Sequence, residues 1–206
     1  MTTARQLDST RESALPIENT RRLVESRLGT RSYPDHHAIA VAACADQLAG
    51  ELALGNELRR TVVEGALLHD VGKLLVDESI LSKTGPLTAD ERRQINLHPL
   101  EGERIVRWSV DAGVADVVRT HHERWDGRGY PHGLTADEIP MAARVVAVAD
   151  AYLAMLEERP YRAPRTQTAA IRELQDGAGT QFDPNCVAAL VSLVAPDPDV
   201  RRDQAL

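Results

Sequence analysis

HHERWDGRGYP, residues 121–131, joins two adjacent histidines and a glutamate to a turn-rich loop around one tyrosine, Tyr130. Gly127, Gly129 and Pro131 punctuate the loop. Polar segments of this kind lie on protein surfaces and often carry binding or catalytic residues, whereas they are poorly suited to building a core. We therefore expect this stretch to form the rim of a functional site. A solvated surface loop is the alternative, and the histidines elsewhere in the chain argue against it.

The apolar pattern on both sides of this stretch is helical. Thr88-Ala89-Asp90-Glu91 fits a capping box that opens one helix, and His98-Pro99 marks another start, with His98 at the cap because the residue before proline avoids the helical region. No run shows the period-two alternation of a strand, so the sequence predicts an all-α fold. The remaining helices are expected at residues 16–28, 35–54, 57–69, 111–121, 141–156, 166–176 and 184–194.

These helices predict one compact domain over residues 31–195. We expect residues 1–30 to form a tail and a short helix, and residues 196–206 to form a C-terminal tail. The helix at 16–28 could dock on the domain or on a second copy of the chain, and the sequence leaves both open. No attached sensor domain is recognisable, so we expect any control of activity to come from a partner protein, from dimerisation or from a metal.

Composition and charge restrict the class of protein. The chain has 206 residues, of which 43% are hydrophobic and 27% charged, the balance of an ordinary globular protein. Its net charge of −7 argues against DNA, RNA or an anionic membrane as a partner. Cys44 and Cys186 lack metal-ligand spacing and are expected to be buried thiols. The N-terminus has no signal-peptide pattern, and we expect a cytoplasmic protein.

Two aspartates suggest chemistry. Asp70 follows His69 in the string LLHDVGK, where Lys73 would lie beside both if the helix continued; an ion pair at a helix end is the alternative. Asp150 lies on an otherwise apolar helix face, four residues after Val146. A buried carboxylate without a partner costs several kcal/mol, so Asp150 requires a cation, and a metal ion is the natural candidate.

The histidines enlarge this candidate set beyond what one catalytic metal ion takes. Its members are His69, Asp70, His98, His121, His122 and Asp150, with His37 or His36 upstream. Adjacent side chains diverge along a backbone, so we expect His121 and His122 to serve different ions, with Asp70 bridging them. Two ions about 3.5–4 Å apart support phosphoester hydrolysis. Imidazole and carboxylate ligands suit iron, manganese or zinc.

Six strings in order, LLHDVGK, LHP, HHERWDGRGYP, IPMAARVVAVAD, ERPYR and GTQFDP, resemble the HD-GYP family from about His37 to Val187. This bacterial signalling family belongs to the HD phosphohydrolase superfamily and hydrolyses cyclic di-GMP. The resemblance implies an all-α HD domain with additional C-terminal helices and a metal centre that often contains iron or manganese. It implies a phosphodiesterase that produces the linear dinucleotide, from which a second round would yield GMP.

The resemblance also implies a role for individual residues. It assigns the metal to His37, His69, Asp70, His98, His121, His122 and Asp150, with Asp70 as the bridging residue. Lys73 corresponds to the lysine that contacts the scissile phosphate, so Asp70 and Lys73 are the expected catalytic pair. Tyr130, Arg159 and Arg162, with Lys73, are the expected substrate-binding residues, because tyrosine offers a stacking face and arginine a planar fork for phosphate or guanine.

The chain departs from the family pattern at three positions. Tyr33 replaces the glutamate of trinuclear members, so we expect two metal ions, with Asp35 or His36 as an improvised ligand. Ala40 and Leu153 replace an arginine and a second aspartate. These differences keep two alternatives open: an HD phosphohydrolase that acts on another nucleotide, and a catalytically weak or inactive cyclic-dinucleotide receptor or protein-docking module.

Overall fold

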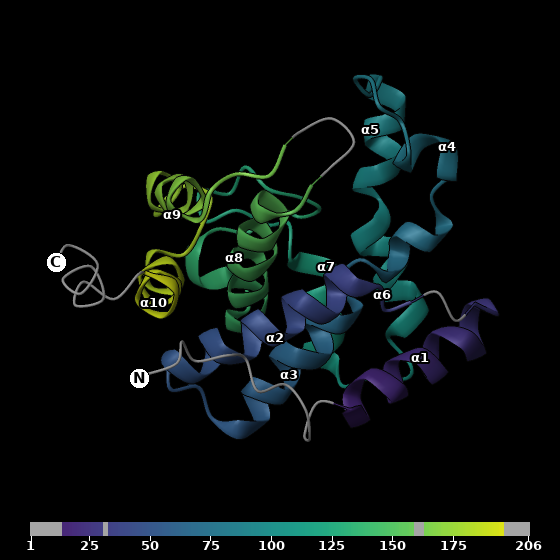
Figure 1. Ribbon diagram of the computed structural model, residues 1–206. Helices are drawn as coiled ribbons and strands as arrows, with labels where there is room; N and C mark the ends of the chain where they lie inside the picture. The colour runs from purple at the N-terminus through teal and green to yellow at the C-terminus, as the bar shows by residue number, and fades with distance from the viewer. Residues whose placement is uncertain (1–13, 31–32, 159–162, 196–206) are drawn as a thin grey trace, which may run out of the picture.

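The computed structural model describes residues 14–30, 33–158 and 163–195 (Figure 1). Within these ranges the chain is all-α, as the sequence predicts, and its only β features are isolated bridges. The α-helices are α1 (Ala14–Leu28), α2 (His36–Glu51), α3 (Asn56–Leu68), α4 (Glu78–Leu81), α5 (Ala89–Asn96), α6 (His98–Val106), α7 (Ala112–Thr120), α8 (Met141–Leu156), α9 (Gln167–Asp176) and α10 (Pro184–Val194). Two 3₁₀ helices, η1 (Val71–Leu75) and η2 (Ala136–Glu138), were not expected from the sequence.

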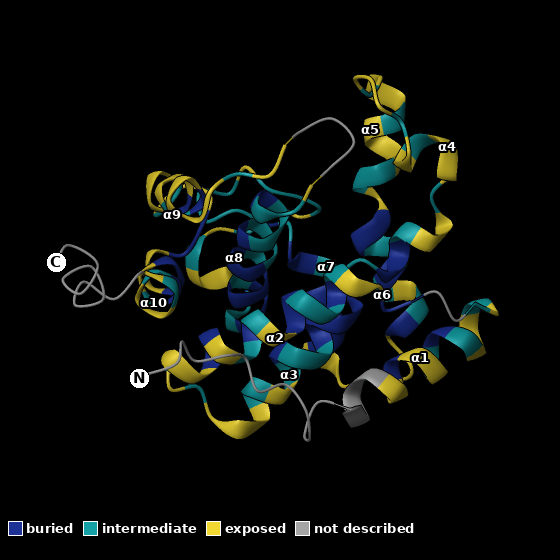
Figure 2. Cartoon of the chain, viewed as in Figure 1, coloured by how far each residue is buried: buried dark blue, intermediate teal, exposed yellow. Residues whose placement is uncertain are grey.

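Helix α8 is the central element (Figure 1), and it packs against α2, α3, α7, α9 and α10. Its alanines and valines are small enough for neighbouring helices to approach closely, and half of its 16 residues are buried. Figure 2 shows the buried residues concentrated on α8 and on the parts of α2, α3 and α7 that face it. Asp150 is therefore carried by a helix whose other face lies in the core of the domain.

Helix α1 docks on the domain in this structure. It packs against α3, and Val24 is completely buried in a second apolar cluster that includes Leu68 and Val106. The contact favours the first of the two arrangements that the sequence left open for this helix. None of the helices in the described part of the chain has the length and continuous apolar character of a bilayer-spanning segment.

The start of α6 corrects one prediction. Thr88 and Glu91 form the expected capping box of α5, but His98 is the first residue of α6 rather than its cap, and Leu97 is the cap. Leu97 itself has helical dihedral angles (φ −81°, ψ −15°), so the chain passes from α5 into α6 with little change of direction. Proline is tolerated in the first helical turn, and here this overrides the extended preference of the residue before it.

Candidate metal centre

Asp70 is the centre of a cluster of histidines from three parts of the chain. It follows α3 and precedes η1, whereas His98 begins α6 and His121 caps the end of α7. Asp70 Oδ1 lies 3.2 Å from His98 Nε2 and 3.9 Å from His121 Nε2, and Asp70 Oδ2 lies 3.2 Å from His69 Nε2. One carboxylate thus faces three imidazoles, the arrangement that the sequence predicts for a bridging residue.

The three imidazoles are held by the same type of backbone hydrogen bond. In each ring Nδ1 donates to the backbone carbonyl three residues earlier: His69 to Ala66 at 2.8 Å, His98 to Ile95 at 2.7 Å and His121 to Val118 at 2.9 Å. These carbonyls lie in the last turns of α3, α5 and α7. A carbonyl can only accept, so Nδ1 carries the proton in each neutral ring and the Nε2 lone pair faces Asp70.

This arrangement is unfavourable unless a cation occupies it. The Nε2 atoms of His98 and His121 are 3.3 Å apart, and in the neutral rings both present lone pairs. His69 Nε2 and Asp70 Oδ1 are buried without a hydrogen-bond partner, which is costly for polar atoms. Imidazole nitrogens and carboxylate oxygens are ligands of divalent transition metals. The donor set therefore fits a metal ion.

His121 and His122 lie on the same side of the site. Both belong to a four-ligand group with Asp70 and His98 in which all candidate ligand atoms lie within 4.8 Å of one another, and their ring centroids are 4.1 Å apart. The expectation that adjacent side chains diverge toward different ions does not describe this geometry. Helix α7 ends at Thr120, and the turn that follows brings the two rings to one face.

A second group joins the first through Asp70. His37, His69 and Asp70 also place one ligand atom each within 4.8 Å of one another. His37 Nε2 lies 2.9 Å from Asp150 Oδ1. Asp150 is thus the partner of a histidine from α2. Its carboxylate is half-buried at the cavity wall, and the cation that it needs there could be a protonated His37 or a metal ion.

The charges around the site explain its titration. Burial opposes protonation of His37, but the hydrogen bonds to Asp150 and Glu157 outweigh burial and raise its pKa to about 9. Burial and the neighbouring His98 lower the pKa of His122 to about 3. Burial would raise the pKa of Asp70, yet His69 and Lys73 hold it well below the usual range. Asp70 is therefore an anion and His122 a neutral imidazole at pH 7.

Lys73 lies beside Asp70 although the helix does not continue. Helix α3 ends at Leu68, and η1 brings the Lys73 ammonium to 2.5 Å from Asp70 Oδ2. The Lys73 side chain is 38% exposed and lines the cavity. In the absence of other cations the ammonium neutralises Asp70, and it lies at the position from which it could also contact an anionic ligand.

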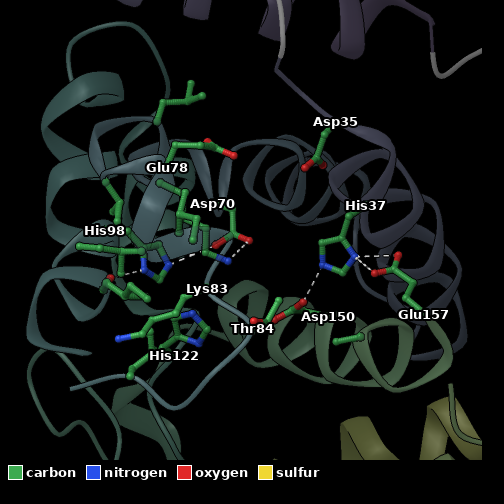
Figure 3. Close-up of a pocket in the computed structure, with 18 of the residues that line it drawn as sticks. Asp35, His37, Asp70, Glu78, Lys83, Thr84, His98, His122, Asp150 and Glu157 are labelled. Atoms are coloured by element: carbon green, nitrogen blue, oxygen red, sulfur yellow. Dashed lines mark hydrogen bonds and ion pairs between the residues drawn. The ribbon is translucent and has the colours of Figure 1, made fainter. Parts of the chain in front are cut away.

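A cavity of about 960 Å³ is lined by five of the predicted ligand residues, His37, Asp70, His98, His122 and Asp150 (Figure 3). Asp70, His98 and His122 lie on one side of the close-up, and His37, Asp150 and Glu157 lie on the other. The volume falls at the upper end of the range for small-molecule sites. The cavity extends along a wall that sequence reasoning did not identify, formed by Leu74, Val76, Glu78, Ile80, Leu81, Lys83, Thr84, Gly85, Pro86 and Leu87. Leu74 and Leu81 are each 37% exposed, so both present apolar surface to the cavity, as is common in ligand pockets. Only the structure shows this exposure.

Hydrogen bonds to Glu123 stabilise the loop that follows His121 and His122. The buried carboxylate of Glu123 accepts hydrogen bonds from the backbone amides of His132, Gly133 and Leu134 at 2.7–3.1 Å. A Cβ on Gly129 would lie 2.6 Å from the His122 carbonyl oxygen, so glycine is required there. This close approach of the loop backbone places the Tyr130 ring against the His122 ring, with ring centroids 4.9 Å apart and an angle of 29° between the ring planes.

The remaining residues that the sequence predicted for the site differ in whether the structure places them at the cavity. Tyr130 lines the cavity. Asp35 accepts from the Ala38 amide as the cap of α2 and His36 is exposed, so His37 is the upstream histidine that faces the site. Arg159 and Arg162, predicted to bind substrate, lie outside the described residues. Glu157, which contacts His37, was not predicted, and nothing in its local sequence distinguishes it from other glutamates at helix ends.

Comparison with known proteins agrees with this fold. The family model of the HD domain matches residues 11–186. The chain belongs to the HD-domain family. Its HD domain is 42% identical over 151 residues to the cyclic di-GMP phosphodiesterase response regulator RpfG of Xanthomonas campestris pv. campestris, a match that covers 71% of the chain and 40% of that protein. It is 37% identical over 168 residues to the 3′3′-cGAMP-specific phosphodiesterase 3 of Vibrio cholerae, covering 81% of the chain and 36% of that protein.

A solved structure supports the same fold. The HD domain superposes on Bd1817, an HDG"Y"P protein from Bdellovibrio bacteriovorus, with a TM-score of 0.66 at 21% identity, covering 89% of this chain and 60% of that one. The predicted all-α HD fold is confirmed. The chain spans less than half the length of the two curated relatives that it matches.

Proposed function

We propose that this HD domain is a metal-dependent phosphodiesterase that hydrolyses cyclic di-GMP to the linear guanine dinucleotide, from which a second round would yield GMP. The observation that carries the proposal is the convergence of three imidazole Nε2 atoms on Asp70, with buried, unpaired polar atoms of His69 and Asp70 beside a cavity of about 960 Å³. Support for the substrate class comes from relatives named as cyclic-dinucleotide phosphodiesterases.

We assign two divalent ions, iron or manganese before zinc, to the two ligand groups. His98, His121 and His122 would hold one ion and His37, His69 and Asp150 the other, with Asp70 between them. Such ions supply Lewis acidity and an activated water for attack on phosphorus. The protein contributes fixed imidazoles whose outer nitrogens are already hydrogen-bonded, so little reorganisation accompanies binding.

The cavity residues have complementary roles in this proposal. The Lys73 ammonium would pair with a non-bridging phosphate oxygen and stabilise the negative charge that develops in the transition state. The apolar wall beside Leu74 and Leu81 offers a surface for a nucleobase, and Tyr130 supports the opposite rim. Arg159 and Arg162 remain candidates for the guanine edge or a phosphate.

A second substrate has a specific observation in its favour, because one relative is named as specific for 3′3′-cGAMP. The two messengers differ in one base, and the described wall offers apolar contact that would suit either. A receptor that binds without turnover is the third possibility, and it differs from both enzymes in leaving the bound nucleotide intact.

The test is anaerobic incubation of the metal-loaded protein with cyclic di-GMP, 3′3′-cGAMP and cyclic di-AMP, with products resolved by chromatography. We expect linear dinucleotide from cyclic di-GMP with added iron or manganese, and at least about 100-fold less product from Asp70→Ala. Faster turnover of 3′3′-cGAMP would reassign the substrate. Intact nucleotide after hours, with no difference between the unaltered protein and Asp70→Ala, would identify a receptor.

A further inference from the structure

His37 cannot make the backbone hydrogen bond that holds His69, His98 and His121. The carbonyls that accept from His69, His98 and His121 lie in the last turn of the helix before each ring. His37 instead lies in the first turn of α2, and the residue three positions earlier, Pro34, precedes that helix. Its outer ring nitrogen therefore needs a partner from another element.

Glu157 supplies this partner. It caps the end of α8, 120 residues away in sequence, and both of its carboxylate oxygens lie 2.9 Å from His37 Nδ1. The other ring nitrogen, Nε2, lies 2.9 Å from Asp150, also on α8. Asp150 and Glu157 are seven residues apart, which places them two turns apart on one helix face. Helix α8 thus holds the His37 ring at both nitrogens (Figure 3).

We propose that Glu157 is a positioning residue of the metal centre: its carboxylate accepts the Nδ1 proton of His37, fixes the ring orientation and keeps Nε2 directed at the ion. Carboxylates behind metal-bound histidines fix the tautomer and raise the basicity of the ligand nitrogen. The inference rests on the proposed metal centre and extends it to a residue that no sequence motif singled out.

A surface ion pair without a role in metal binding is the competing explanation. The Glu157 side chain is 38% exposed, and exposed ion pairs contribute little. Two features favour the positioning role: the His37 side chain is only 18% exposed, and without Glu157 its Nδ1 proton has no other partner among the hydrogen bonds of the described residues. The ring would then be free to rotate or to adopt the other tautomer.

The experiment is a calorimetric titration of metal-depleted full-length protein with Mn²⁺, without nucleotide. We expect Glu157→Ala to weaken Mn²⁺ binding about 10-fold or more. Glu157→Gln retains a carbonyl oxygen that can accept from Nδ1, so its loss should be clearly smaller. Glu158→Ala removes the adjacent, exposed carboxylate and should bind Mn²⁺ as the unaltered protein does. Thermal unfolding of each metal-free variant checks that the fold is intact, and Glu157→Gln keeps the test valid if Glu157→Ala does not fold.

Each outcome has a separate meaning. Equal Mn²⁺ affinity in the unaltered protein, Glu157→Ala and Glu157→Gln would overturn the positioning role while leaving the metal centre in place. Loss of one whole Mn²⁺ equivalent in both Glu157 variants would also overturn it, because Glu157 would then be a direct ligand. Absence of Mn²⁺ binding by the unaltered protein would refute the metal centre, and this inference with it.

Discussion

Gly72 and His98 are in direct backbone contact: a Cβ on Gly72 would lie 2.0 Å from the His98 carbonyl oxygen and 2.6 Å from the Gly102 amide nitrogen. The contact joins η1 to the first turn of α6. Because Asp70 lies two residues before Gly72, this close approach fixes the distance between the central carboxylate and the His98 imidazole. Close packing against the backbone of α6 therefore explains why position 72, in the string HDVGK, is a glycine.

Gly72→Ala should disrupt this contact. A methyl group has no room against backbone atoms, so η1 and α6 must separate, and we expect the free energy of unfolding to fall by about 3 kcal/mol. Urea denaturation of the metal-free protein measures the loss. Gly85→Ala is the control, since a Cβ there meets nothing within 4 Å; similar losses in both variants would contradict the packing argument.

Asp150→Ala should lower the metal content of the protein and its stability together. The substitution removes a proposed ligand and leaves the half-buried His37 ring without its Nε2 partner. We expect the content to fall from about two ions per chain by at least one, with a loss of about 2 kcal/mol in the metal-free protein. Elemental analysis and thermal unfolding provide the two readouts. Unchanged metal content would remove Asp150 from the ligand set.

Tyr33→Phe should not destabilise the protein. The Tyr33 hydroxyl is buried and makes no well-formed hydrogen bond in the described part of the chain. Burial and the charge of Asp70 keep its pKa well above the usual value, and the Asp70 backbone amide opposes them only in part. Removal of a buried hydroxyl that is so poorly paired should leave the free energy of unfolding unchanged or raise it by about 1 kcal/mol. Tyr152→Phe, which removes a hydroxyl that interacts with Gln167, should lower it. Destabilisation by Tyr33→Phe would reveal a partner for this hydroxyl.

Metal-free protein should lose stability at alkaline pH. The pKa of His37 is about 9 in the folded protein, compared with 6.5 for the unperturbed residue. The stabilisation that comes from the protonated ring is therefore fully present below pH 6.5 and disappears as the pH rises through 9. The loss should be on the order of 2–3 kcal/mol. Chemical denaturation of chelator-treated protein from pH 6 to 9.5 measures it, and His37→Gln should flatten the profile. An equal slope in both proteins would assign the effect to another group.

Local chemistry alone predicted a large part of this protein. The capping box of Thr88 and Glu91, the start of α10 after Asp183 and the apolar periodicity of α8 depend on neighbours within a few residues, which the sequence contains. Six of the seven proposed metal ligands could be named for a related reason, because histidines and carboxylates in apolar surroundings are costly unless they share a cation. The seventh, His37, was distinguished from His36 only by the family resemblance.

Tertiary structure decided how those groups meet. His121 and His122 face the same site because α7 ends just before them, and side-chain direction at a helix end depends on the turn that follows. Glu157 became part of the site because the packing of α8 against α2 brings it to His37 across 120 residues. The docking of α1 and the wall along Leu74 and Leu81 arise in the same way. Such contacts follow from the burial of distant segments against one another, and no local pattern encodes them.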